Sequence, residues 1–281
     1  MNINLLRKCK KWTLFNYPNK ISTTYTKTKR VRRYYNKQRP IASHNISIGC
    51  FNVRGLNTKK DVWKDYLLKQ NLDIVGLTET KCGTLNGSEF IWNDRYTIGK
   101  PSGGATIGHK KLMLNHVSVV HKETDIVAID VTGFAVLCNS FRLIVVYVRN
   151  TLGTIGKKEL FNKLCSLCTN ISPKTAKPVI IMGDFNMDLF KNRLFAEWVR
   201  DMGLVNASHR FGMENKNTFN INRNGILVPI SIIDYCLITP NIKLDSLTIT
   251  EAPRINEKYI TDHNGIIITT GLPKTWENHH I

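Results

Sequence analysis

Residues 178–188 read P-V-I-I-M-G-D-F-N-M-D and join a wholly apolar run to a turn with polar side chains. The run at 178–182 has no polar alternation, which predicts a strand covered on both faces. Gly183 permits a tight turn at the end of this strand, and Asp184 and Asn186 follow it. Gly-Asp-x-Asn also forms ordinary surface turns, so this stretch alone leaves both a structural and a catalytic interpretation open.

The surrounding chain predicts strands that alternate with helices. Strands are expected at 45–53, 73–78, 117–121, 126–131, 143–148, 232–238, 246–250 and 265–270. A pattern like a capping box at 58–61 predicts the start of one helix, and apolar residues at helical spacing predict two more, at 160–168 and 190–202. Cys165 and Cys168 fall on the apolar stripe of the second helix, which favours core packing over a metal or redox role.

Composition limits the class of protein. The chain has 281 residues, of which 42% are apolar and 22% charged, so it can bury a sizeable core. Its most apolar region, 126–148, is interrupted by Asp130, Asn139 and Arg142, and no membrane-spanning segment is predicted. The seven cysteines, an odd number, do not resemble a disulfide framework, which indicates a reducing, intracellular setting.

The formal net charge of +19 is concentrated near the N-terminus. Residues 1–40 hold 12 Lys or Arg and no Asp or Glu, which leaves a net charge of +7 on the rest. Such a balance favours an anionic partner, nucleic acid before an anionic membrane. We therefore expect residues 1–43 to be a disordered leader, a nuclear-entry or nucleic-acid-binding arm, or a mitochondrial presequence, with the nucleus favoured over the mitochondrion. One domain is expected at 44–273, followed by a tail at 274–281.

Further polar side chains occur at the ends of predicted strands. Asn52, Glu79, Tyr147 and Asp234 lie at or near the C-terminal ends of four strands, and Asp262 and His263 lie just before another. Singly, each has an ordinary structural explanation: Glu79 fits a solvated strand end and His263 a satisfied turn histidine. If the sheets bring these ends together, four carboxylates meet beside a histidine, two amides and a phenol. That much negative charge requires a cation.

Seven short motifs together resemble the endonuclease/exonuclease/phosphatase superfamily, which includes exonuclease III-type abasic endonucleases, deoxyribonuclease I-like enzymes and the endonuclease domains of non-LTR (LINE-type) retrotransposons. In chain order they are N-V-R-G-L-N at 52–57, L-T-E-T-K at 77–81, Gly103-Gly104, Tyr147, G-D-F-N at 183–186, I-D-Y at 233–235 and T-D-H at 261–263. Their order and spacing fit over about residues 45–272, and the first two motifs are most similar to the retrotransposon branch. The resemblance implies an α/β fold, a four-layer sandwich of two packed mixed β-sheets flanked by helices.

The resemblance also implies a metal site. If these residues act as their counterparts in the family do, Glu79 would bind Mg²⁺, or Mn²⁺ in its place. Asn52 and Asp262 would help to hold the metal or its waters. The chemistry of phosphodiester hydrolysis independently supports a metal site, because the reaction requires neutralised phosphate oxygens. Mg²⁺ is commonly bound by one or two carboxylates and retains several waters.

The remaining polar residues would act on the substrate. The family motif implies that Asp184 orients or deprotonates the attacking water and that Asn186 binds the scissile phosphate. His263, oriented by Asp234, would bind the phosphate and stabilise its growing charge, assisted by the phenol of Tyr147.

Three positions depart from the family pattern. Arg149 stands where proline is usual after the tyrosine, Ser231-Ile232 precedes I-D-Y where arginine or a ring-bearing neighbourhood is common, and Asn264-Gly265 follows the histidine where proline is common. The second departure argues against a pocket for a flipped-out abasic sugar. Nicking of ordinary DNA is therefore favoured over dedicated abasic-site repair.

Three functions fit these observations. The first is a Mg²⁺-dependent phosphodiester hydrolase, an endonuclease that nicks DNA and derives from a retroelement. Its expected partners are nucleic acid, DNA in the first place, and a reverse transcriptase encoded elsewhere, with no membrane. The second is a phosphoesterase acting on inositol or sphingolipid headgroups, against which the basic charge argues. The third is a non-catalytic DNA-binding relic, against which the full set of proposed catalytic side chains argues.

Overall fold

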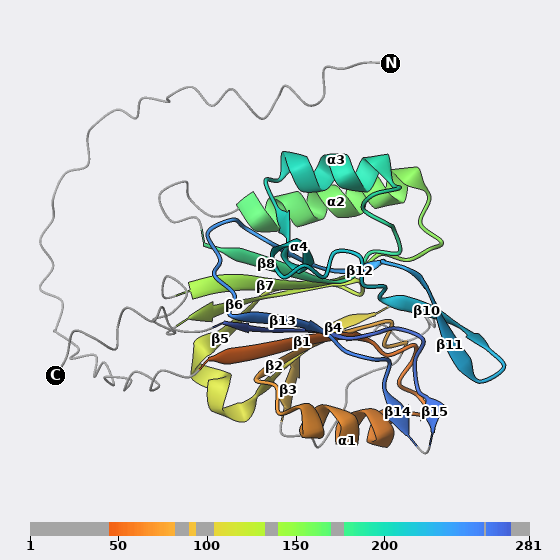
Figure 1. Ribbon diagram of the computed structural model, residues 1–281. Coiled ribbons are helices and arrows are strands. Elements are labelled where there is room, and N and C mark those ends of the chain that lie inside the picture. The colour runs from red at the N-terminus through yellow and green to blue at the C-terminus, as the bar shows by residue number, and fades with distance from the viewer. Residues whose placement is uncertain are drawn as a thin grey trace, which may run out of the picture. The chain divides into compact units, whose positions relative to one another are not determined.

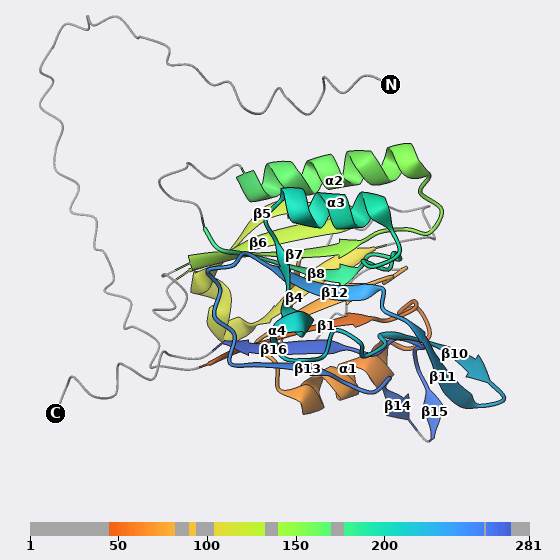
Figure 2. The same ribbon diagram turned by 45° about the horizontal axis from the view of Figure 1, so that its top comes forward.

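Two six-stranded sheets pack face to face in the computed structural model, with helices on their outer faces (Figures 1 and 2). The described residues are 45–81, 90–93, 104–132, 140–169, 177–255 and 257–270. The four-layer α/β sandwich that the sequence predicts is confirmed. The expected leader at 1–43 and tail at 274–281 lie outside the described residues.

The first sheet has the strand order β13-β16-β1-β2-β4-β3. Its strands are β1 (Ile46–Asn52), β2 (Ile74–Thr78), β3 (Phe90–Asn93), β4 (Ala105–Lys110), β13 (Ser246–Ile249) and β16 (Ile266–Thr270). β1 and β2 are parallel and are connected through helix α1 (Lys60–Gln70), whereas the other neighbours are antiparallel. α1 covers the outer face of this sheet, where Trp63 and Leu67 are buried with Phe51 and Leu77.

The second sheet has the strand order β5-β6-β7-β8-β12-β9. Its strands are β5 (Val117–Lys122), β6 (Ile126–Thr132), β7 (Ser140–Tyr147), β8 (Val179–Asp184), β9 (Val205–Asn206) and β12 (Asp234–Ile238). β7 and β8 are parallel and are connected through α2 (Thr154–Thr169), and the other neighbours are antiparallel. In both views α2 and α3 (Arg193–Asp201) lie over the outer face of this sheet.

β8 is covered on both faces, as its apolar run predicts. Ile180 and Met182 belong to the core between the two sheets, whereas Val179 and Ile181 belong to the outer core under α2 and α3. Alternate side chains of one strand therefore fill two different layers, which leaves no polar face.

Two glycines allow close approach within the sandwich. Gly183 at the end of β8 has φ 150°, and a Cβ there would lie 1.9 Å from the carbonyl oxygen of Val146, so a side chain has no space. Gly76 on β2 faces the other sheet, where a Cβ would lie 2.6 Å from a methyl carbon of Val145 on β7. The second glycine thus lies where the two sheets touch.

Two helix starts differ from the sequence predictions. The capping box predicted at 58–61 is wrong, because Lys59 and not Thr58 is the N-cap of α1, and no side chain caps the helix. The chain closes a turn just before the helix, in which the Lys59 N–H donates to the Leu56 carbonyl (3.0 Å). The helix predicted at 190–202 begins late, because Asn192 caps it by accepting the Phe195 N–H (3.0 Å).

Several short elements complete the described chain. They are the 3₁₀-helix η2 (Lys111–His116), α4 (Ala207–Arg210), the hairpin β10 (Phe219–Arg223) with β11 (Ile226–Ser231), and the pair β14 (Arg254–Ile255) with β15 (Lys258–Tyr259). Cys165 and Cys168 are partly buried and pack against the outer core, as predicted. Among the described residues, no helix combines the length and the apolar composition that crossing a lipid bilayer requires.

Candidate active site

The polar residues at the strand ends gather at one edge of the two sheets. Asn52 ends β1, and Tyr147 and Asp184 end the parallel strands β7 and β8. Asp234 corrects one expectation, because it begins β12 and does not end it; since β12 is antiparallel to β8, it still lies opposite Asp184. Seven of the eight predicted site residues line one cleft of about 380 Å³: Asn52, Glu79, Tyr147, Asp184, Asn186, Asp262 and His263. The eighth, Asp234, reaches the cleft through its contact with His263.

Asp184 is the most buried carboxylate of the cleft, with 1% of its surface exposed. Its Oδ2 accepts a hydrogen bond from the side-chain amide of Asn52 (2.8 Å), which comes from the other sheet. The backbone N–H of Asn186 donates to Oδ1 (2.8 Å), and the Asn186 side chain donates to Oδ2 (3.1 Å) and to the Val148 carbonyl (2.9 Å). Asn186 has φ 49°, a left-handed conformation that asparagine tolerates well. The turn of the G-D-F-N motif and the neighbouring Asn52 therefore fix the carboxylate by three hydrogen bonds.

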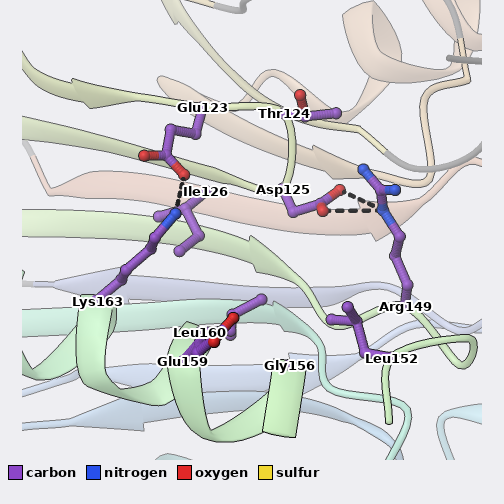
Figure 3. A pocket seen from close by; sticks show the side chains of 10 residues that line it. All are labelled: Glu123, Thr124, Asp125, Ile126, Arg149, Leu152, Gly156, Glu159, Leu160 and Lys163. Carbon is purple, nitrogen blue, oxygen red and sulfur yellow. Dashed lines mark hydrogen bonds and ion pairs between the residues drawn. The ribbon is translucent and has the colours of Figure 1, made fainter.

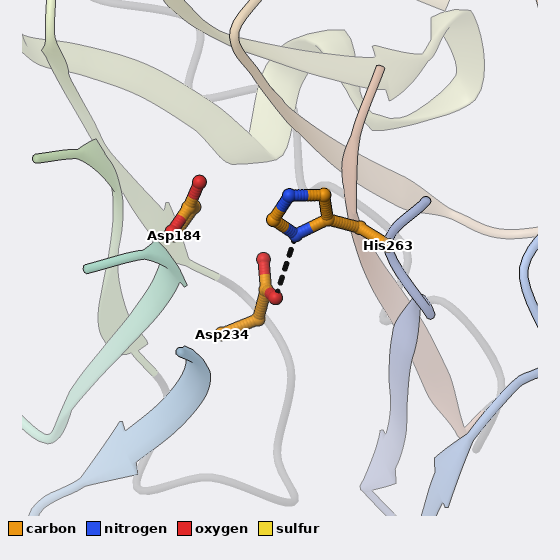
Figure 4. Close-up of side chains that lie close together, drawn as sticks. All are labelled: Asp184, Asp234 and His263. Atoms are coloured by element: carbon orange, nitrogen blue, oxygen red, sulfur yellow. Dashed lines mark hydrogen bonds and ion pairs between the residues drawn. The ribbon is translucent and has the colours of Figure 1, made fainter. Parts of the chain in front are cut away.

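His263 and Asp234 form a buried pair (Figure 4). Nδ1 of His263 lies 2.9 Å from Oδ2 of Asp234, and Nε2 points away from this contact and lies 3.4 Å from the Asn52 amide nitrogen. The ring also packs against Phe219, with 5.1 Å between ring centroids. A carboxylate at Nδ1 fixes the ring orientation and presents Nε2 to the cleft.

The electrostatics of the cleft favour a charged histidine. Burial by itself would lower the pKa of His263, but the charge and hydrogen bond of Asp234, followed by the charges of Asp184 and Asp262, raise it to about 9. Burial and then the charge of Asp234 raise the pKa of Asp184 well above its ordinary range. The cleft thus pairs an imidazolium with a carboxyl group that takes up protons readily.

Glu79 joins the two sheets from the end of β2. It has φ 55°, which costs a non-glycine residue about 1–2 kcal/mol. Its backbone carbonyl accepts the Gly55 N–H (2.8 Å), and its Oε1 accepts the Tyr147 hydroxyl (3.1 Å) and lies 3.2 Å from the Lys81 ammonium. Burial and then the charge of Glu79 raise the pKa of the Tyr147 phenol, which therefore remains a donor at neutral pH.

Asp262 has one oxygen that accepts a hydrogen bond and one that does not. Arg54 donates to Oδ2, whereas Oδ1 is buried without a hydrogen-bond partner and lies 4.0 Å from Nε2 of His263. A buried, unpaired carboxylate oxygen is costly unless a cation or a donor satisfies it. The carboxylates of Asp262 and Glu79 are hard oxygen donors of the kind that Mg²⁺ prefers, and both line the cleft. These residues fit a Mg²⁺ ion, although the Asn52 Oδ1 already accepts the Arg54 N–H (2.9 Å).

A second group of possible metal ligands is compact. In the described part of the chain, ligand atoms of Asp184, Asp234 and His263 all lie within 4.8 Å of one another. Two of these groups already bind each other, and the raised pKa of His263 keeps its ring protonated, which opposes metal binding through nitrogen. The predicted metal set of Glu79, Asn52 and Asp262 is the better candidate for these reasons.

Sequence reasoning gave no role to three residues that support the site. Arg54 and Lys81 lie inside the motifs at 52–57 and 77–81, and that position was the available signal. In the structure they pair with Asp262 and Glu79. Thr218 had no sequence signal. Its hydroxyl oxygen accepts the backbone N–H groups of Ile233 and Asp234 (both 3.0 Å), which fixes the start of β12.

A second cavity of about 370 Å³ lies between the turn before β6 and helix α2 (Figure 3). Its two cations are paired, Arg149 with Asp125 (2.9 Å) and Lys163 with Glu123 (2.8 Å). Arg149, which departs from the family pattern, holds the Asp125 side chain, and the backbone carbonyl of Asp125 accepts the Tyr147 N–H (2.9 Å). These contacts hold the backbone of Tyr147, whose side chain lines the cleft described above.

Comparison with known proteins identifies the fold. No family model and no curated protein sequence matches the chain. Among solved structures, the endonuclease domain of TRAS1, a telomere-specific non-LTR retrotransposon, has a TM-score of 0.61 at 15% identity, over 82% of this chain and 100% of that one. An endonuclease/exonuclease/phosphatase family protein from Bacteroides thetaiotaomicron has a TM-score of 0.61 at 14% identity, over 85% and 99%. TDP2 from D. rerio, complexed with a single-strand DNA product, has a TM-score of 0.57 at 14% identity, over 81% and 99%. The chain has the fold of the endonuclease/exonuclease/phosphatase superfamily, as the motifs predict.

Proposed function

We propose that the protein is a Mg²⁺-dependent phosphodiester hydrolase, an endonuclease that nicks DNA. The observation that carries the proposal is the convergence, in one cleft of this fold, of the fixed Asp184 carboxylate and the His263–Asp234 pair. The likeness to TRAS1 endonuclease and to TDP2 with its DNA product supports a nucleic-acid substrate. The net charge of +19 supports a polyanionic one.

The residues divide the chemistry between them. Asp184 accepts a proton from the attacking water and orients it, and a raised pKa suits a base that works near neutral pH. The Asn186 side chain would bind a phosphate oxygen by redirecting one of its two N–H groups, which donate to Asp184 and Val148 in this structure. His263, held as an imidazolium by Asp234, donates from Nε2 to the phosphate as negative charge develops on it. The phenol of Tyr147 lines the same cleft and would assist by turning its single O–H, which donates to Glu79 in this structure, toward the phosphate.

Glu79 and Asp262 would hold the metal, with Asn52 beside them. When bound, Mg²⁺ supplies positive charge that neutralises the phosphate oxygens. The protein's own contribution is a fixed pair of carboxylates at the cleft wall, and the unpaired Oδ1 of Asp262 is the oxygen best placed to gain from a cation.

A retroelement origin is part of the same proposal. The motifs at 52–57 and 77–81 resemble the retrotransposon branch, and a TRAS1 domain is among the structural neighbours. On this proposal the protein works in the nucleus, beside a reverse transcriptase encoded elsewhere.

The test is the conversion of supercoiled plasmid to nicked circles. We expect nicking in Mg²⁺ and none in EDTA. Asp184→Asn should lower the rate by roughly 10² or more, because a positioned base is lost. Asp201→Asn, the same change at an exposed site on α3, is the matched control and should leave the rate unchanged. Nicking that persists in EDTA would refute the metal site, and full activity of Asp184→Asn would refute the assignment of the base.

A further inference from the structure

A smaller, positively charged pocket adjoins the cleft. It has a volume of about 130 Å³, and Arg54, Lys59, Asn222, Tyr259 and Asp262 are among the residues that line it. Arg54 and Asp262 line the cleft as well, so the two hollows meet at these two side chains. A group bound in the small pocket would therefore be the immediate neighbour of a group bound in the cleft.

Cations exceed anions in this pocket. Its lining holds two cations, Arg54 and Lys59, and one carboxylate, Asp262, which Arg54 already pairs. The Lys59 ammonium donates to the Ile260 carbonyl (2.6 Å), which holds it in place but does not neutralise it. Burial and then the charge of Arg54 lower the pKa of Lys59, so the two cations are close enough to repel each other. A bound anion would relieve this repulsion.

A third cation packs against one of the residues that line the pocket. The Arg254 guanidinium lies 4.1 Å from the centre of the Tyr259 ring, a cation–π arrangement that keeps its charge near the pocket. The amide of Asn222 adds a neutral hydrogen-bond donor from the hairpin. The combination of cations with an amide donor is the donor set that binds phosphate oxygens.

The position of the pocket suits an extended polyanion. Its walls come from the start of α1, from the hairpin β10–β11 and from β15, and both views place the two β-ribbons at the same end of the molecule (Figures 1 and 2). Because the phosphates of a nucleic acid strand recur at every nucleotide, a strand with one phosphate in the cleft presents another to its surroundings.

We propose that this pocket binds one internal phosphodiester group of the DNA strand, next to the group held in the cleft, with Lys59 and Arg54 as its cations. The proposal rests on the endonuclease function proposed above and adds a second phosphate subsite to it. Lys59 acts on affinity and register and takes no part in the chemical step.

Equilibrium binding measures the subsite without turnover. Fluorescence anisotropy of a labelled DNA duplex in EDTA would compare the wild-type protein with Lys59→Gln, Lys59→Arg and Lys69→Gln. We expect Lys59→Gln to weaken binding roughly five- to tenfold at physiological salt and to reduce the slope of log K against log salt by about 0.9. Lys59→Arg keeps the charge and should bind within about twofold of the wild type. Lys69→Gln removes the same charge at the exposed far end of α1 and should also bind DNA within about twofold of the wild type.

Neutral linkages then locate the contact. The nick made by the wild-type protein in Mg²⁺ fixes the register, and a set of duplexes carries one uncharged methylphosphonate at successive positions around it. At one position beside the nick, the neutral linkage should weaken wild-type binding about as much as Lys59→Gln does, and the variant should show no further weakening there. Arg54→Gln should show the same position dependence.

Two outcomes would overturn the subsite. Lys59→Gln and Lys69→Gln could weaken binding equally, or the Lys59→Gln effect could be the same on every duplex; either result makes Lys59 a general surface charge. If the wild type nicks plasmid while this coupling is absent, the subsite is wrong and the endonuclease proposal stands. If the wild type neither nicks nor binds DNA, both proposals fail.

Discussion

At the residue scale, the His263–Asp234 pair acts through a single contact, 2.9 Å between Nδ1 and Oδ2. His263→Ala removes the proposed donor to the phosphate and should lower turnover roughly 10²-fold. Asp234→Asn removes the charge that keeps the ring protonated and oriented, so its effect should be similar. The double variant should be little worse than either single one, because both remove one unit.

Initial nicking rates of the wild type, the two single variants and the double variant in Mg²⁺ test this double-mutant cycle. Circular dichroism confirms that each protein is folded. Rate reductions that multiply in the double variant would show that Asp234 has a role independent of the ring. Phe219→Leu is a useful control, because Phe219 contacts the ring without a hydrogen bond and should change the rate far less.

Seven of the site residues that the sequence singles out line one cleft, because short motifs mark them at strand ends or in the turns beside strands; their catalytic roles stay predictions. Asp184 and Asn186 are separated by one residue, so local chain geometry alone relates them. Thr218 is different: it bonds the start of β12 from 16 residues away along the chain, and only the tertiary fold brings the two together. Side chains whose partners are set by tertiary contacts leave no periodic pattern to recognise.

At the element scale, an ion triad ties strands β6 and β7 to the segment that leads into β8. Arg142 donates to both oxygens of Asp130 (2.7 and 3.1 Å), its cross-strand partner, and Lys177 donates to Oδ2 (2.7 Å). Burial opposes ionisation of Asp130, but hydrogen bonds and charges from Arg142 and Lys177 outweigh it and lower its pKa. Removing one partner of such a buried ion pair lowers the free energy of unfolding by about 3 kcal/mol.

Asp130→Asn should therefore reduce the free energy of unfolding by about 3 kcal/mol at pH 7, measured by urea denaturation. Since the folded-state pKa lies below the ordinary value of about 4, the carboxylate stabilises the fold above that value and this stabilisation disappears as the pH falls through the folded-state pKa. The difference in the free energy of unfolding between Asp130→Asn and the wild type should therefore become smaller in that acid range. Asp245→Asn, an exposed control, should show neither effect. A gap that stays constant down to acid pH would mean that the triad is not the cause.

Elements buried on both faces are predictable from sequence, whereas exposed ones are harder to recognise. The apolar run of β8 predicts its strand correctly, but the hairpin β10–β11 carries few buried side chains and no clean alternation. A turn signal was nevertheless present at its tip. Asn224 and Gly225 have φ 54° and 85°, as the two central residues of a type I′ turn require.

At the scale of the whole molecule, charge is distributed unevenly along the chain. Twelve cations without an anion lie in residues 1–40, and every proposed site residue lies at or beyond Asn52. Deletion of residues 1–40 should therefore weaken DNA binding and flatten its salt dependence, by about 0.9 in slope for each phosphate that these cations neutralise in the full-length protein. Turnover at saturating DNA should stay within a few fold.

Salt titrations of binding and nicking rates at saturating DNA test both parts of this expectation. An unchanged salt slope would identify the segment as a targeting leader. Failure of the truncated protein to turn over or to fold would instead place the segment within the folded domain and refute the boundary expected near residue 43.

The contact at Gly76 has a consequence for how the protein can change. Asn52 and Glu79 come from one sheet and Asp184 and Tyr147 from the other, so both hydrogen bonds between them bridge the gap. Glycine at position 76 works as a spacer of minimal thickness, because a single methyl group there would press on Val145. The packing between the two sheets thus sets the distance between the two walls of the cleft. A substitution in the core, outside the cleft, can therefore change the width of the cleft, so that buried carbon atoms as well as charged side chains at its rim determine what fits there.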